Sequence, residues 1–137
     1  MKNDLRTFDV QFVEIAANFE KAFNFISDPA NLPKWTAAFK EADENTALLG
    51  TPAGELKINL KTIATVSGTI DWHMTMPDGS AGRAYSRLTE LPNGHVVYSF
   101  VLLAPPVPVE QIEGTLEMQK KLLAEELINL TNILENN

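Results

Sequence analysis

The segment VEQIEGTLEMQKKLLAEELINLTNILE, residues 109–135, decides the fold of this chain. Its apolar residues recur at spacings of three and four, with Glu, Lys and Gln between them, which is the pattern of an amphipathic helix with one apolar stripe. The preceding Pro108 suits the start of a helix. Such a helix is about 40 Å long, so its stripe needs a broad partner surface, and the antiparallel sheet predicted below is the candidate. The stripe comprises Val109, Ile112, Leu116, Leu123, Leu127, Leu130 and Leu134.

The middle of the chain has the alternation of apolar and polar residues that is typical of strands. It is clearest in residues 56–66, where Lys57 and Lys61 lie on one side of the predicted strand. The other side carries Leu56, Ile58, Leu60, Ala64 and Val66. Short turns containing Gly or Asn separate the segments, because these residues tolerate the positive φ of hairpins. Further strands are predicted at 39–43, 46–51, 69–76, 81–90 and 95–103, with turns at 67–68, 77–79 and 92–94.

The N-terminal part adds one strand and two helices. Over residues 6–15, Phe8, Val10 and Phe12 alternate with polar residues, which predicts a strand with one buried face. Asn18 can cap a helix that follows, and a second, short helix is predicted at 31–38. The order is therefore strand, two helices, six strands and a long helix, which indicates an α+β fold in a single domain spanning residues 1–137.

Composition narrows the classes of function. The chain has 137 residues, 45% of them hydrophobic, no cysteine and a net charge of −7. An acidic surface disfavours nucleic acid as a partner, and absence of cysteine fits a reducing compartment, so we expect a cytoplasmic protein. No apolar stretch reaches the ~18 residues that a membrane span requires, so no stable membrane insertion is expected, and the opening residues do not resemble a signal peptide.

Metal and nucleophile chemistry have little support in the sequence. Its two histidines, His73 and His95, are isolated from any carboxylate cluster with metal-ligand spacing. No serine has a histidine partner that the pattern would place beside it, and no Gly-rich phosphate loop is present. We therefore expect no metal and no cofactor, and the pattern designates no catalytic residue.

Four stretches carry a resemblance to a known superfamily. They are FVEIAANFEKAFNFISDPANLPKW (12–35), GTIDWHMTMPDG (68–79), GRAYSRLTELPNGHVVYSFVL (82–102) and EELINLTNILE (125–135). Together they resemble the START/SRPBCC superfamily, the helix-grip fold, which includes lipid-transport domains and the polyketide cyclase/dehydrase group. The resemblance implies a curved seven-stranded antiparallel sheet wrapped around the C-terminal helix, with an apolar cavity between them for lipids, sterols or polyketides. It implies a pocket but no particular reaction.

Strand alternation then selects candidate lining residues. Trp72 and Met74 share the apolar face of their strand, whereas Asp71 and His73 share the other, so His73 is predicted to lie outside the cavity. For the strand at 81–90 the pattern leaves open which face lines the cavity. The candidate ligand-binding residues are Trp35, Trp72, Met74, Met76, Arg83, Tyr85, Tyr98 and Leu123.

Three functions remain open at this point. The leading hypothesis is binding or transport of a small hydrophobic ligand of the lipid, polyketide or aromatic type. The alternative is an enzyme like the polyketide cyclase/dehydrases or aromatases, which convergence of Arg83, Tyr85 and Tyr98 inside the cavity would favour. A third hypothesis is a partner-binding domain, indicated by an exposed apolar patch, and the sequence also leaves open a homodimer.

Overall fold

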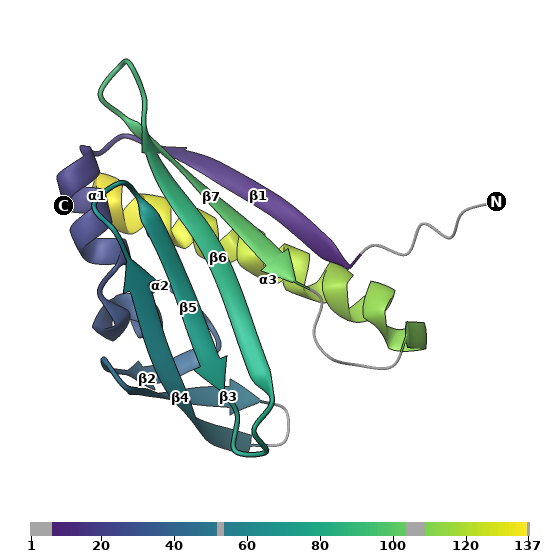
Figure 1. The fold of residues 1–137 in the computed structure, drawn as a ribbon. Coiled ribbons are helices and arrows are strands. Elements are labelled where there is room, and N and C mark those ends of the chain that lie inside the picture. The colour runs from purple at the N-terminus through teal and green to yellow at the C-terminus, as the bar shows by residue number, and fades with distance from the viewer. Residues whose placement is uncertain (1–6, 52–53, 104–108, 137) are drawn as a thin grey trace.

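The computed structural model describes residues 7–51, 54–103 and 109–136 and has the predicted α+β architecture (Figure 1). Seven antiparallel strands form a curved sheet in the order β1-β7-β6-β5-β4-β3-β2. The strands are β1 (Phe8–Ile15), β2 (Phe39–Ala42), β3 (Thr46–Thr51), β4 (Gly54–Ala64), β5 (Thr69–Thr75), β6 (Ala81–Glu90) and β7 (Val96–Leu103). The helices are α1 (Phe19–Ile26), the short 3₁₀ helix η1 (Pro29–Asn31), α2 (Leu32–Trp35) and α3 (Val109–Glu135).

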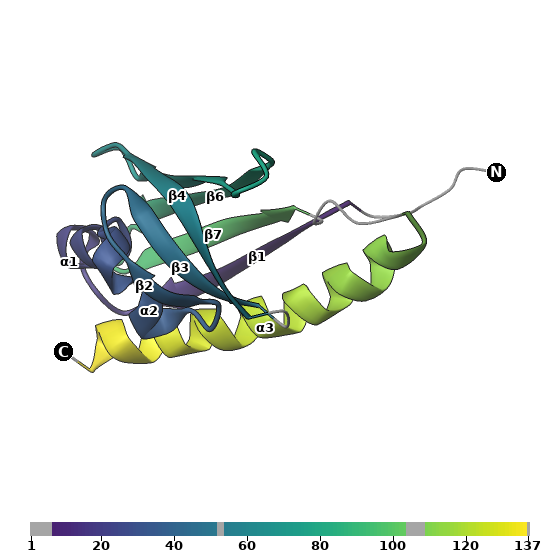
Figure 2. The same ribbon diagram turned by 90° about the horizontal axis from the view of Figure 1, so that it is seen from below.

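The long helix α3 lies along one face of the curved sheet, and α1 and α2 lie near its C-terminal end (Figure 2). The described part of its apolar stripe is buried, which confirms that part of the prediction; the side chains of Val109 and Ile112 lie outside the described residues. Burial of this stripe against the sheet forms the core and is the main force that holds the two layers together. The buried stripe consists of Leu116, Leu123, Leu127, Leu130 and Leu134, and it faces a core that includes Ile15, Ile58, Ile70, Leu88 and Val96.

Strand β1 presents its apolar residues to the outside. Phe8, Val10 and Phe12 lie on the face turned away from α3, and Phe12 is 71% exposed. The prediction that they form the buried face is therefore wrong. The cause is the register with β7: Gln11 pairs with Phe100, directly paired residues share a face, and Phe100 belongs to the core.

Strand β1 is also fastened to α3 by polar contacts. The Gln11 side-chain amide donates to the Lys120 carbonyl at 2.9 Å, and the Ala16 N–H donates to the Glu135 carboxylate at 2.9 Å. The inward Gln11 of β1 therefore binds the backbone of the helix, and the backbone that follows β1 binds a side chain near the end of the helix.

The first two helices begin and end where local chemistry dictates. The Asn18 side chain accepts a hydrogen bond from the Lys21 N–H at 2.8 Å, which confirms the predicted cap of α1. Helix α2 is shorter than the predicted 31–38, because Thr36 is already extended, with φ −106° and ψ 155°, and β2 begins soon after.

The turn between β4 and β5 requires a glycine. Gly68 has φ +113°, and a Cβ built on it would lie 2.0 Å from the Leu88 carbonyl oxygen. The Gly68 N–H donates to the Thr65 carbonyl at 2.9 Å, so the turn begins at Thr65. Val66 therefore lies in the turn and is 89% exposed, so its predicted place on the apolar side of β4 is wrong.

Candidate functional site

A cavity of about 270 Å³ lies between the sheet and α3. Its wall comes from α2 and the connection to β2, from five strands and from the middle of α3, so residues far apart in the sequence meet there. The lining residues are Leu32, Trp35, Thr36, Ala38, Phe39, Leu49, Trp72, Met74, Ala84, Phe100, Leu102, Gln119, Leu122, Leu123 and Glu126.

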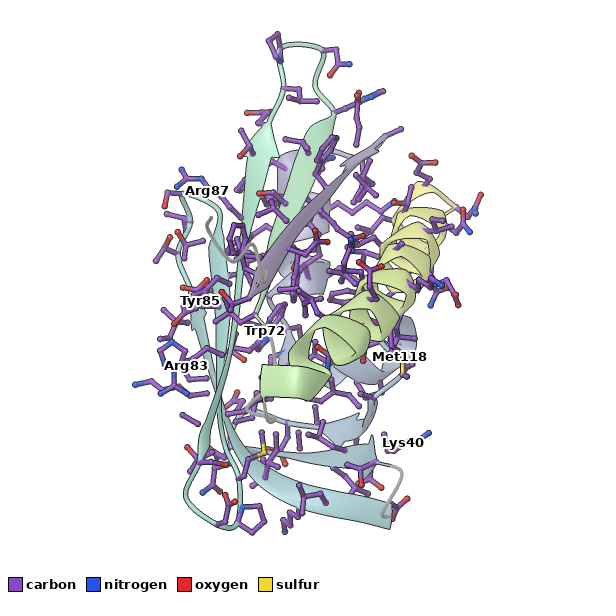
Figure 3. The ribbon with its side chains drawn as sticks, turned by 90° about the vertical axis from the view of Figure 1, so that its right-hand side faces the viewer. Lys40, Trp72, Arg83, Tyr85, Arg87 and Met118 are labelled. Carbon is purple, nitrogen blue, oxygen red and sulfur yellow. The ribbon has the colours of Figure 1, made fainter. Side chains whose placement is uncertain are left out.

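The structure brings four of the predicted site residues to this cavity. Trp35 comes from α2, Trp72 and Met74 come from β5, and Leu123 comes from α3. Figure 3 shows Trp72 between the sheet and α3, on the side that strand alternation predicted. Whether these side chains contact a ligand remains a prediction.

Two predicted residues face inward without joining the cavity wall. Met76 follows β5, is partly buried and packs against the core. Tyr98 is fully buried, and its hydroxyl donates to the Ser86 hydroxyl at 2.8 Å, which in turn donates to the Ile70 carbonyl. Burial raises the pKa of the Tyr98 hydroxyl far above its ordinary value. Tyr98 is therefore a neutral, internally satisfied group beneath the cavity.

Arg83 and Tyr85 lie on the opposite face of the sheet from the cavity. Both project outward in Figure 3, together with Arg87. The Arg83 guanidinium donates to the Gly82 carbonyl at 2.8 Å, and the His73 and Tyr85 rings meet edge to face at 6.4 Å. The side chains of Ser86 and Leu88 are those that β6 buries, which settles the face that the pattern left open.

Aromatic rings form one wall of the cavity. The Trp35 and Trp72 ring centres are 6.4 Å apart, and Trp72 stacks on Phe100 at 6.5 Å with 27° between the planes. Each indole is only 2% exposed. Neither indole N–H has a hydrogen-bond partner among the described residues, although a buried donor normally finds one.

Glu126 is a cavity residue that the sequence analysis missed. One of its carboxylate oxygens, Oε2, accepts a hydrogen bond from the Ala37 N–H at 2.7 Å. Burial raises its pKa above the ordinary value for glutamate, the Ala37 hydrogen bond opposes this, and the neighbouring Glu125 adds to it. Glu126 lies three residues after Leu123 and Gln119 four before it, so the helical period that defined the stripe places all three at the cavity.

Two further properties concern the described residues alone. No cluster of three or more His, Asp or Glu side chains in them could hold a metal ion. No helix in the described part of the chain is long and apolar enough to cross a membrane.

Comparison with known proteins rests on structure, because the sequence matches no protein-family model and no curated protein. A START superfamily protein from Mycobacterium smegmatis superimposes with a TM-score of 0.67 at 14% identity, over 94% of this chain and 99% of that one. The Aha1 dimer from Colwellia psychrerythraea gives a TM-score of 0.65 at 17% identity, over 95% of this chain and 97% of that one.

A third similar structure is DynU16, a protein in the dynemicin biosynthetic locus. Its TM-score is 0.61 at 10% identity, over 95% of this chain and 49% of that one. At these identities the likeness shows the fold alone. The chain therefore has a START/SRPBCC-type helix-grip fold, as the resemblance in its sequence implied.

Proposed function

We propose that this protein binds or transports a small hydrophobic molecule, of lipid, polyketide or aromatic type, in the cavity between the sheet and α3. The observation that carries the proposal is the cavity itself, whose wall is mostly aliphatic and aromatic and is interrupted by few polar groups. This is the composition of small-molecule sites in general. Transfer of apolar ligand surface from water would supply the affinity, at roughly 25 cal/mol per Å².

The cavity volume limits the size of the ligand. At about 270 Å³, it lies just below the range of ~300–1,000 Å³ that small-molecule pockets usually have. A single aromatic ring system or a short alkyl chain therefore fits the proposal better than a sterol or a long acyl chain.

The enzyme alternative has less support. It would gain from convergence of Arg83, Tyr85 and Tyr98 inside the cavity, but the first two lie on the outer face and Tyr98 donates to Ser86 below the wall. Glu126 is the single ionisable group among the described lining residues, so no acid–base pair of side chains meets there.

A pair of neighbouring substitutions tests the proposal. We expect Trp72→Ala to weaken binding of the apolar fluorescent probe N-phenylnaphthylamine at least about tenfold, because it removes an aromatic wall. His73→Ala is the control, since His73 adjoins Trp72 on the outer face, and we expect probe affinity and stability to stay close to those of the unmodified protein. Probe fluorescence and urea unfolding measure the two effects. Equal probe affinity in all three proteins would refute the proposal.

A cavity-filling variant separates loss of binding from loss of folding. Trp72→Ala also leaves a void, which costs about 3–5 kcal/mol for such truncations. Ala84→Phe instead adds a ring at the lining position of β6, so we expect it to exclude the probe while the protein stays folded. Ala81→Phe makes the same change at an exposed position of the same strand and should bind the probe normally.

Self-association is a separate proposal. The outer face of the edge strand β1 exposes Phe8, Val10 and Phe12, and exposed apolar edges favour pairing with another chain. A similar fold has been solved as a dimer, so we propose that two copies of this chain meet at β1.

We also propose a cytoplasmic location, because the chain has no cysteine.

A further inference from the structure

The described lining of the cavity carries one negative charge and no positive charge to balance it. Among its described lining residues, Glu126 is the single charged side chain, and no Lys, Arg or His lines it. Thr36 and Gln119 are the neutral polar members, and the remaining lining side chains are apolar. Because a cavity wall of low polarity screens charge weakly, the Glu126 carboxylate dominates the local potential that a ligand would meet.

The structure holds this carboxylate in place without neutralising it. Oε2 accepts the Ala37 N–H at 2.7 Å, which fixes the side chain against the connection between α2 and β2. In the described part of the chain, no basic side chain forms an ion pair with Glu126, and its other oxygen, Oε1, has no donor. A partly buried carboxylate without a countercharge is unfavourable, and the raised pKa of Glu126 is the expected sign of that cost.

The aromatic wall complements the same kind of ligand. Trp35, Phe39, Trp72 and Phe100 line the cavity together with Glu126. Aromatic faces attract cations through their quadrupole, most strongly for tryptophan, and an ammonium group donates strong hydrogen bonds to a carboxylate. Negative charge on the ligand would instead face Glu126 with no basic side chain to compensate it.

We propose that the ligand is a small apolar molecule carrying a protonated amine, with its ammonium group at Glu126 and its hydrocarbon part against Trp35 and Trp72. The inference rests on the proposed function, since it names the class of ligand for the same cavity. It excludes fatty acids and other apolar carboxylates as preferred ligands. Neutral apolar molecules should bind more weakly than amines and more tightly than carboxylates.

A matched series of ligands tests the inference. Octylammonium, octanol and octanoate share one alkyl chain and differ in the charge of the head group, and each would compete with bound N-phenylnaphthylamine. At about pH 8 the amine is protonated and an ordinary carboxyl group is ionised. We expect octylammonium to displace the probe at about a tenfold lower concentration than octanoate, with octanol between them, at physiological salt.

Two neighbouring glutamates provide the variant and its control. Glu126→Gln removes the charge and keeps an oxygen that can accept the Ala37 N–H, so we expect the protein to fold. In this variant the affinities of octylammonium and octanoate should both approach that of octanol. Glu125→Gln removes the same charge at an exposed position one residue away that does not line this cavity, and the preference should persist. Gln119→Lys places a cation on the same wall, and we expect it to favour octanoate.

The outcomes separate this inference from the proposed function. If neither the probe nor octanol binds, the proposed function fails. If both bind but octanoate competes as well as octylammonium, the proposed function stands and the amine inference is overturned. The inference also falls if the preference survives in Glu126→Gln, or if Glu125→Gln lowers it equally, because the net charge of −7 would then explain it.

Discussion

Glu126 is the residue whose ionisation works against the fold. Because burial raises its pKa, the folded state binds its proton more tightly than the unfolded chain does. The stability that Glu126 contributes is therefore fully present below pH 4.5, the ordinary pKa of glutamate, and is lost as the pH rises through the raised pKa of the folded state. Above that range, the folded protein carries a buried charge that the unfolded chain leaves in water.

We expect this effect to appear as a slope in stability against pH. The free energy of unfolding, measured with urea between about pH 4 and pH 8, should fall less with rising pH in Glu126→Gln than in the unmodified protein, because Gln has no proton to lose. Glu125→Gln should keep the original slope. A slope that is the same in all three proteins would show that Glu126 ionises normally.

Single residues differ in how far the sequence determines their place. Alternation predicts opposite faces for Trp72 and His73, and the structure confirms it, because alternation along a strand is strict and only one face of β5 is apolar. Arg83 and Tyr85 could be placed only once the pairing of β6 with its neighbours was known. The sequence pattern does not single out Glu126, because glutamate usually lies at the surface of a protein. Only the rotation of α3 against the sheet brings this residue to the cavity.

At the scale of the elements, helix α3 stabilises the fold through one side of its surface. Leu127 is buried and Ile128 is 59% exposed, although they are adjacent in the sequence. Leu127→Ala should lower the free energy of unfolding by about 2–5 kcal/mol, because it leaves a cavity in the core. Ile128→Ala should change it by less than about 1 kcal/mol. Urea denaturation measures both, and similar losses would contradict the orientation of the helix.

Elements were predictable where their ends carry chemical signals and less so where they do not. The cap at Asn18 and the glycine turns define α1 and the hairpins. The apolar alternation of β1 located a strand but not its buried face, because pairing with β7 selects that face. Helix α2 ended early because the chain becomes extended at Thr36, where no glycine or proline marks the change.

The shape of the whole molecule leaves the outer face of β1 open to a second copy. We expect the protein to sediment as a dimer at micromolar concentration and Phe12→Lys to shift it toward the monomer, since a charge at this exposed position opposes apolar pairing. Val66→Lys changes an apolar side chain that is 89% exposed in a distant turn and should leave the dimer intact. A monomer in the unmodified protein, by analytical ultracentrifugation, would refute the proposed dimer.

The cavity is a property of the whole molecule and could be predicted only through the resemblance to the superfamily. Its wall combines Trp35, Leu49, Trp72 and Leu123 from four separate elements. A hydrophobic pattern shows that such residues avoid water, but it does not show whether they touch one another or leave a space. Which of them lines a space depends on the curvature of the sheet and its distance from α3.

The position of α3 in the chain has a consequence for biosynthesis. It follows all seven strands of the sheet and therefore leaves the ribosome after them, yet it binds the residue that follows β1 through the hydrogen bond from the Ala16 N–H to the Glu135 carboxylate, 119 residues apart. Earlier elements cannot supply its five buried leucines, so the nascent chain exposes the apolar face of the sheet until this helix emerges. A growing polypeptide in that condition is a natural client for chaperones at the tunnel exit, and a pause in translation between β7 and α3 would prolong its exposure to aggregation.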